Sequence, residues 1–429
     1  MKKGFDRMSK ELLHTPDGVR DIYNLECAKK DAVEKKISEV IKRYGYRNIQ
    51  TPTFEFFDIF KKERGSVISK EMFKFFDRDG ETLVLRPDIT PSIARSAAKY
   101  FMDEDMPIRL SYCGNIFINR SSYQGRLKES TQIGAELIGD VTGDADAEMT
   151  AMLIDCLLQA GLNDFQVEIG HINFFNGLME AAHLDEDDKD YLRTLIENKN
   201  YFGVENFISE KEMAADVKHA ILEMPKMFGT IDQIQEAKAL VQNIPVSLSA
   251  IEALEELYDV LKLYGVENYI TFDLGMLGKF KYYTGIIFKA YTYGTGDAIA
   301  TGGRYDKLLM QFGKQAASIG FGIGLDALMI ALERQKIEVD TDIVGTILLY
   351  DRRQKAAAIH LAAHLRSKGA NLQLMKKYYE KEVEDYLEYA RRSYIGEILY
   401  IDEAGEMVQV IPANGGKVRT TPLRECLER

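Results

Sequence analysis

The chain has 429 residues, of which 46% are hydrophobic and 28% are charged. This length allows two or three domains with substantial cores, and the composition excludes an intrinsically disordered chain. The formal net charge of −12 argues against a large electrostatic footprint for nucleic acid. No apolar run reaches the roughly 18 residues that a membrane span needs. Because residues 1–10 also lack a signal-peptide core, a cytoplasmic protein without membrane contact is expected.

The cysteine and histidine residues predict no metal site and no cofactor. The four cysteines are scattered without CxxC spacing, which favours ordinary reduced thiols. His360 and His364 stand four apart on a predicted helix, but nothing near them supplies a third ligand. They are therefore interpreted as core or surface histidines.

The first part of the chain predicts a helix followed by a strand at an edge or an interface. Apolar residues recur at helical spacing from Val33 to Tyr44, and Gly45 is typical of a helix end. The stretch Ile49–Glu55 has strand character but contains Pro52, which cannot donate to a ladder. A plain loop is the alternative for this stretch.

A predicted hairpin over residues 73–86 leads through Asp88 and Thr90 into a helix from about Ser92 to Tyr100. Polar side chains at such a junction either cap the helix or contact a ligand, and both possibilities stay open here. Farther on, residues 132–139 alternate in strand fashion, so that Gln132 and Glu136 share one face. A buried carboxylate needs a cation or donor, which makes Glu136 a ligand candidate; surface exposure is the alternative.

The middle of the chain predicts a helical insertion between two strands. Residues 165–171 and 270–274 have strand patterns, whereas residues from about 174 to 265 are almost wholly helical in pattern. Their Met and Leu stripes are packing faces without a motif for chemistry.

Lys281–Gly285 and Thr301–Asp306 enclose two apolar runs, Ile286–Tyr293 and Ala298–Ala300, which predict a β-hairpin carrying a polar pocket. The alternative is an ordinary hairpin with its tyrosines in the core. The small-residue strand Ala317–Gly324 follows. Its glycines permit a close approach to a nucleotide, but packing of a helix on the sheet is sufficient to explain them.

After a charged linker near residues 336–342, strand and helix patterns alternate to the end of the chain. The predicted domains are therefore residues 1–340, with the helical insertion at about 174–265, and residues 341–429, a small α/β domain.

Several motifs occur in an order that is similar to histidyl-tRNA synthetase and to its paralogue, the regulatory subunit of ATP phosphoribosyltransferase. They are Gly18-Val19-Arg20-Asp21, Leu85-Arg86-Pro87-Asp88-Ile89-Thr90, Gln132-Ile133-Gly134-Ala135-Glu136, Tyr282-Tyr283-Thr284-Gly285, Gly302-Gly303-Arg304-Tyr305-Asp306 and Gly320-Phe321-Gly322-Ile323-Gly324. The resemblance covers about residues 15–332. It implies an α+β fold with the antiparallel sheet core of class II aminoacyl-tRNA synthetases. By the same resemblance, the last domain looks like a diverged anticodon-binding domain.

The resemblance also implies a histidine pocket. Asp88, Thr90 and Gln132 would face the α-ammonium group, and Glu136 and Tyr283 would face the imidazole. Tyr282 and Arg304 would line or support that pocket.

Three departures favour the paralogue over the enzyme. Ile118, Gly278 and Ala327 stand where the synthetase has cationic groups around ATP. Losing one such contact typically costs on the order of a hundredfold in rate. Arg126, Lys279 or Lys281 could substitute, but a lysine lacks the bidentate fork of an arginine.

The resemblance thus implies a non-catalytic regulatory subunit of ATP phosphoribosyltransferase, which acts in the first step of L-histidine biosynthesis. The expected partners are the short-form catalytic subunit, a second copy of the chain across the Pro52 region, and L-histidine. No tRNA binding is expected. The alternatives are a divergent histidyl-tRNA synthetase and a synthetase-like sensor of uncharged tRNA or histidine in another pathway.

Overall fold

The computed structural model describes residues 13–61, 67–120, 127–277, 282–341 and 345–428. Its contacts divide the chain into two compact units. One comprises the residues up to Arg20 together with Val33–Glu338, and the other comprises Asp21–Ala32 together with Val339–Arg429. No helix within these described ranges is long and apolar enough to cross a membrane.

A nine-stranded sheet forms the centre of the first unit, in the order β1-β5-β6-β12-β11-β10-β7-β9-β8. Its strands are β1 (Arg47–Asn48), β5 (Ile108–Phe117), β6 (Glu129–Ile138), β7 (Phe165–His171), β8 (Phe228–Gly229), β9 (Ile270–Asp273), β10 (Ile286–Thr292), β11 (Ala300–Arg304) and β12 (Ser318–Gly324). The run from β5 to β7 is antiparallel throughout, and only the pairs β1–β5 and β7–β9 are parallel. This sheet and its helices confirm the predicted α+β class.

Helices that pack beside this sheet have the expected apolar stripes. They are α2 (Asn24–Arg43), α3 (Thr90–Tyr100), α4 (Gly143–Gln159) and α11 (Leu325–Arg334). Helix α2 buries Val33, Ile37, Val40 and Ile41, which are the residues whose spacing predicts it. Helix α3 begins at Thr90, two residues earlier than expected, and its N-cap is Ile89, which makes no side-chain cap bond.

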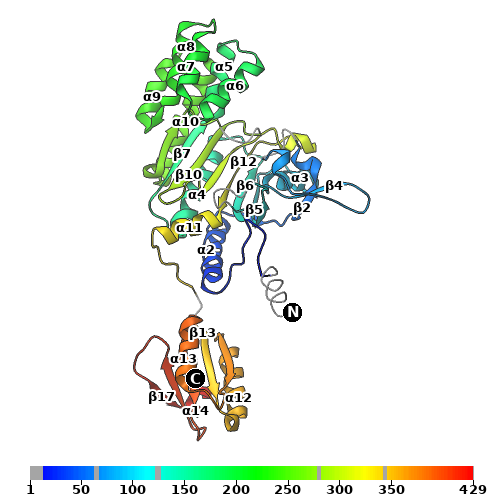
Figure 1. Cartoon of the computed structure of the whole chain (residues 1–429). Coiled ribbons are helices and arrows are strands. Elements are labelled where there is room, and N and C mark those ends of the chain that lie inside the picture. Colours follow the sequence, from blue (N-terminus) through cyan, green and yellow to red (C-terminus); the bar gives the residue numbers. More distant parts are fainter. Residues whose placement is uncertain (1–12, 62–66, 121–126, 278–281, 342–344, 429) are drawn as a thin grey trace, which may run out of the picture. The chain divides into compact units, whose positions relative to one another are not determined.

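The helical insertion lies between β7 and β9, which pair side by side in the sheet. It comprises α5 (Ile172–Ala181), α6 (Glu186–Glu197), α7 (Tyr201–Ser209), α8 (Ala215–Glu223), α9 (Ile231–Leu240) and α10 (Pro245–Tyr264). Helices α5 to α9 gather in one cluster beyond the end of the sheet (Figure 1). Within this cluster the short strand β8 returns to pair with β9, which the sequence pattern does not predict.

A separate three-stranded sheet has the order β2-β4-β3 and consists of β2 (Phe54–Phe56), β3 (Lys74–Phe76) and β4 (Thr82–Leu85). The predicted strand over Ile49–Glu55 is wrong for most of its length, because residues 49–52 have no strand structure. Two of their carbonyls instead accept hydrogen bonds from Arg86. Its Nη1 donates to the carbonyl of Thr51 at 2.8 Å and to that of Pro52 at 3.3 Å.

The second unit contains a five-stranded sheet in the order β14-β13-β15-β16-β17. Its elements are β13 (Gly345–Tyr350), α12 (Lys355–Ser367), β14 (Leu372–Lys376), α13 (Val383–Arg392), β15 (Ile395–Ile401), β16 (Met407–Pro412), β17 (Arg419–Pro422) and α14 (Leu423–Glu428). Apolar clusters lie on both faces of this sheet, around Ile347 with Tyr386 and around Leu348 with Leu361. β17 and α14 are short and nearly bare of buried apolar residues, so the sequence pattern does not predict them.

Candidate ligand-binding site

A cavity in the first unit brings together all the predicted pocket residues except Arg304. Helix α3 and the turn before it supply Thr90 and Asp88, strand β6 supplies Gln132 and Glu136, and the segment before β10 supplies Tyr282 and Tyr283. Strand β5 also supplies Tyr112, and strand β11 with the residue after it supplies Thr301 and Tyr305. Strand β12 supplies Gly320, Phe321 and Gly322. Residues more than 190 positions apart in the chain thus form a single polar site.

Glu136 is the buried acid of this cavity and is 1% exposed. Its Oε1 accepts a hydrogen bond from Thr90 Oγ1 at 2.7 Å, and its Oε2 accepts one from the Tyr305 hydroxyl at 2.6 Å. Burial raises the pKa of Glu136 to about 8, against the opposing effect of these two hydrogen bonds, and the charge of Asp88 raises it further. The alternative of an exposed Glu136 is therefore wrong, and so is a capping role for Thr90.

Tyrosine rings surround this acid. The Tyr282 hydroxyl donates to Asp88 Oδ2 at 3.1 Å. The Tyr282 ring packs edge to face against the rings of Tyr283 and Tyr305, with centroids 5.0 and 6.0 Å apart. Burial raises the pKa of Tyr112, Tyr282, Tyr283 and Tyr305 well above the usual phenol value. The phenols therefore stay neutral and act as hydrogen-bonding walls.

Gln132 carries an acceptor that no other described group satisfies. Its Oε1 is shielded from solvent and has no hydrogen-bond partner among the described residues. Buried polar atoms are normally paired, so an orphaned acceptor in a cavity wall points to a donor supplied by a ligand. An α-ammonium group would be such a donor.

The cavity itself is small. About 20 Å³ is free in it, which is room for about one water molecule. Two larger clefts share its walls. The sheet cleft, of about 440 Å³, shares Asp88, Gln132 and Tyr283 with the cavity, and the insertion cleft, of about 750 Å³, shares Tyr282 and Tyr283. A ligand as large as an amino acid thus needs the tyrosine walls to move toward one of these clefts.

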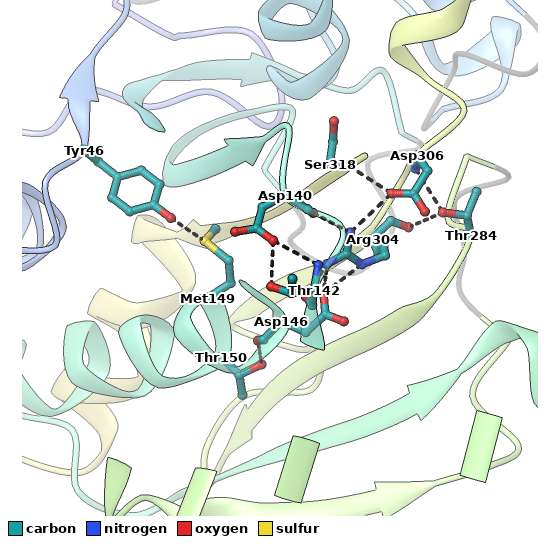
Figure 2. A network of polar contacts seen from close by, with 10 residues as sticks. All are labelled: Tyr46, Asp140, Thr142, Asp146, Met149, Thr150, Thr284, Arg304, Asp306 and Ser318. Atoms are coloured by element: carbon teal, nitrogen blue, oxygen red, sulfur yellow. Dashed lines mark hydrogen bonds and ion pairs between the residues drawn. The ribbon is translucent and has the colours of Figure 1, made fainter. Parts of the chain in front are cut away.

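Arg304 does not line the cavity, so of the two predicted roles, lining the pocket or supporting it, only support remains. Figure 2 shows its guanidinium among Asp140, Thr142, Asp146 and Asp306. Nε and Nη2 donate to Asp146 Oδ1 at 2.9 and 2.6 Å. Nη1 donates to the Asp140 carbonyl at 2.9 Å, and Nη2 donates to the Thr142 carbonyl at 3.1 Å. The residue ties the end of β11 to the start of α4, and its carbonyl accepts from the Thr284 amide at 2.7 Å.

The sequence analysis missed Tyr112 and Tyr305 as cavity residues. Tyr305 stands next to Arg304 in the Gly302–Asp306 motif, and because successive strand residues point to opposite faces, only one of the two can face the cavity. Tyr112 could have been found from the antiparallel pairing that places it beside Gly134, two residues from Gln132 and from Glu136.

The glycines of β12 make room for cavity side chains. Gly320 pairs with Glu136 and Gly322 with Gly134 across the β12–β6 ladder. A Cβ atom on Gly320 would lie 1.6 Å from Glu136 Oε2, and one on Gly322 would lie 2.2 Å from Gln132 Nε2. The glycines thus serve neighbouring side chains, not the helix packing that the sequence analysis considered sufficient.

The sheet cleft contains two of the three positions at which the resemblance implies a missing cation. Ile118 and Ala327 line it, together with the cations Arg120, Lys128 and Lys289. Gly278, Arg126, Lys279 and Lys281 lie outside the described residues. No group of histidine, cysteine and acidic side chains suited to a metal ion occurs in the part of the chain that the structure describes.

The family of histidyl-tRNA synthetases has a sequence model that matches residues 18–328. An ATP phosphoribosyltransferase regulatory subunit from Acetivibrio thermocellus is 37% identical over 98% of this chain and 100% of its own length. The chain belongs to the family of ATP phosphoribosyltransferase regulatory subunits.

Solved structures agree with this family. An ATP phosphoribosyltransferase regulatory subunit/histidyl-tRNA synthetase from Bacillus halodurans has a TM-score of 0.80 at 32% identity, over 91% of this chain and 98% of that one. A histidyl-tRNA synthetase from Nostoc has a TM-score of 0.79 at 19% identity, over 97% of this chain and 98% of its own. At that identity the second likeness shows a shared fold. The chain therefore shares its fold with a histidyl-tRNA synthetase.

Proposed function

We propose that this regulatory subunit has no chemistry of its own. It binds the short-form catalytic subunit of ATP phosphoribosyltransferase, enables that subunit to transfer the phosphoribosyl group of PRPP to ATP in the first step of L-histidine biosynthesis, and helps carry feedback inhibition by histidine. The observation that carries the proposal is 37% identity to a regulatory subunit over nearly the whole of both chains. Feedback of this kind requires a difference in histidine affinity between states of the assembly.

L-Histidine is the proposed ligand of the cavity. Asp88 and Gln132 offer acceptors to an α-ammonium group, and Glu136 offers a carboxyl group to the imidazole. The tyrosine rings provide flat walls of matching size. A cavity built from hydrogen-bonding groups also rejects ligands that leave those groups unpaired.

The absence of aminoacylation is part of the proposal. Its support is that Ile118 and Ala327, which cannot carry positive charge, line the sheet cleft where a synthetase stabilises the phosphates of ATP. Arg120, Lys128 and Lys289 line the same cleft. These three cations favour the alternative function, a divergent histidyl-tRNA synthetase. Histidine-dependent exchange of pyrophosphate into ATP tests it, and turnover at the level of a synthetase would establish the alternative.

The deciding experiment mixes the chain with a short-form catalytic subunit. We expect the rate of phosphoribosyl transfer to rise by at least tenfold on mixing and to fall again when L-histidine is added. Isothermal titration with L-histidine, on the chain alone and on the complex, tests the cavity separately. Absence of stimulation would overturn the regulatory function, and absence of heat in both titrations would remove histidine from the cavity.

Self-association is proposed to use the bare face of the three-stranded sheet, next to Pro52. Phe54, Phe56 and Phe75 lie on this face, and the rings of Phe54 and Phe75 meet edge to face at 5.7 Å. Phe54 and Phe56 are 52% and 54% exposed. The opposite face is covered at Val84, against which Phe60 and Met72 pack. Half-covered apolar sheets of this kind are typical of surfaces that meet a second protein.

Binding of tRNA is not part of the proposal, and the second unit is proposed to be a diverged anticodon-binding domain.

A further inference from the structure

A groove of about 640 Å³ lies on the first unit, away from the cavity. Four exposed apolar side chains, Met102, Met106, Val141 and Met310, line it. Met106, Val141 and Met310 are 70%, 79% and 53% exposed, which is unusual for a cluster of such residues. We call this surface the methionine groove. Methionine side chains are flexible and polarizable, so they suit a surface that adapts to a partner.

One wall of the methionine groove is an acidic loop in the sequence Met102-Asp103-Glu104-Asp105-Met106. The loop is held in place by Lys314, which is buried and whose ammonium group donates to the carbonyls of Met102 and Glu104 at 3.1 Å each. That ammonium group therefore fixes the backbone of the loop, from which the acids Glu104 and Asp105 line the groove. The groove thus combines apolar side chains with a fixed negative rim.

The methionine groove and the ligand cavity are joined by consecutive residues. Tyr305 holds Glu136 in the cavity at 2.6 Å, and the next residue, Asp306, lines the groove. Asp306 is itself held at two points, because its Oδ1 accepts from the Ser318 amide and its own amide donates to Thr284 Oγ1, both at 3.0 Å. Figure 2 shows Asp306 and Thr284 beside Arg304 in this network. A ligand that displaces Tyr305 from Glu136 therefore acts on the residue next to the groove.

We propose that the methionine groove is the docking surface for the catalytic subunit, which enters it with apolar side chains flanked by basic residues. Tyr305 and Asp306 then transmit the state of the histidine cavity to that contact. The proposal rests on the regulatory function above. A second copy of the chain fits the groove less well, because a two-fold contact would bring two acidic loops together. The bare phenylalanine face is the surface available for self-association.

Two groove variants test the docking surface. Met310→Glu places a charge among the apolar side chains, and the double variant Glu104→Lys, Asp105→Lys reverses the rim. We expect each variant to raise the dissociation constant for the catalytic subunit by at least about tenfold, because central apolar anchors dominate interface energies. The rim variant should also lose the salt dependence of association. Leu263→Glu, a change of an exposed leucine at the end of α10, is the matched control and should bind as the native chain does.

The outcomes separate this proposal from the proposed function. If the native chain binds and stimulates the catalytic subunit while both groove variants bind equally well, the groove proposal is overturned and the function stands. If the native chain neither binds nor stimulates, the function itself fails. If the groove variants instead lose self-association in sedimentation, the groove is a contact between copies of this chain, which also overturns the proposal.

The link to the cavity is tested with Tyr305→Phe, which removes the hydroxyl that reaches Glu136. The measured quantity is the ratio of the dissociation constants for the catalytic subunit with and without saturating histidine, with saturation verified by titration. We expect this ratio to fall to about one in Tyr305→Phe. It should stay at the native value in Tyr46→Phe, which removes another buried hydroxyl, bound to Glu148 at 2.8 Å. A native ratio in Tyr305→Phe would refute the link.

Discussion

At the scale of single residues, Glu136 predicts how stability depends on pH. Folding raises its pKa from 4.5 to about 8, so between these values the folded chain holds a proton that the unfolded chain has lost. Stability therefore falls as the pH rises through this interval, by on the order of a few kcal/mol. Glu136→Gln removes this dependence, because its amide stays neutral and, like the protonated carboxyl group, donates one hydrogen bond to the hydroxyls of Thr90 or Tyr305.

The measurement is the urea midpoint of the native chain and of Glu136→Gln at pH 5, 7 and 9. We expect the urea midpoint of the variant minus that of the native chain to increase as the pH rises. Asp259→Asn, at an acid of α10 that pairs on the surface with Lys262, is the control and should follow the native curve. A constant difference between native chain and Glu136→Gln would contradict the raised pKa.

Arg304 marks the limit of sequence reasoning at this scale. Six predicted pocket residues do line one cavity. Local patterns place each of them on a strand, turn or helix, and the family resemblance indicates which of these elements lie together. The guanidinium group of Arg304 instead pairs with Asp146, 158 residues earlier, across a strand and a helix end. Nothing in the local pattern of the Gly302–Asp306 motif states which of two adjacent side chains faces the cavity, since that depends on the register with β12.

At the scale of elements, apolar periodicity predicts the helices and most strands well, because each buries one face. It fails where backbone bonding is decided by distant partners. Residues 49–52 have the composition of a strand, but Arg86 takes the carbonyls of Thr51 and Pro52. Likewise, Thr301–Arg304 has the composition of a loop, but it pairs with β12 as part of β11. In both cases the long-range contact overrides local propensity.

The close fit of β12 against β6 gives a prediction for this pair of strands. In Gly320→Ala the new methyl group would overlap Glu136 Oε2 and approach the Ala135 carbonyl to 2.8 Å. The carboxyl group must move, so we expect a loss of about 1–3 kcal/mol in stability and the loss of histidine binding. Gly296→Ala, at a turn where a Cβ meets nothing within 4 Å, should change neither quantity. Thermal unfolding and calorimetric titration measure the two effects, and unaltered histidine binding in Gly320→Ala would mean that the ligand does not use Glu136.

At the scale of the whole molecule, three surfaces with different chemistry divide the proposed tasks. The small cavity is polar and aromatic, the methionine groove is apolar with the acids Glu104 and Asp105 at one wall, and the phenylalanine face is apolar. Because the groove shares Asp306 with the segment that holds Glu136 through Tyr305, ligand binding and docking can influence each other. The phenylalanine face shares no residue with either, so self-association should be independent of histidine.

This independence is open to a direct test. Phe54→Glu combined with Phe56→Glu puts two charges on the bare face, where a second copy would have to desolvate them. We expect sedimentation equilibrium to change from a dimer to a single chain of 48.7 kDa. The groove variant Met310→Glu should stay dimeric, as should Phe202→Glu, which alters an exposed phenylalanine of α7. Histidine should leave all four sedimentation masses unchanged. A native chain that sediments as 48.7 kDa at micromolar concentration would refute self-association through this face, whereas a dimer that resists the double change would place the contact elsewhere.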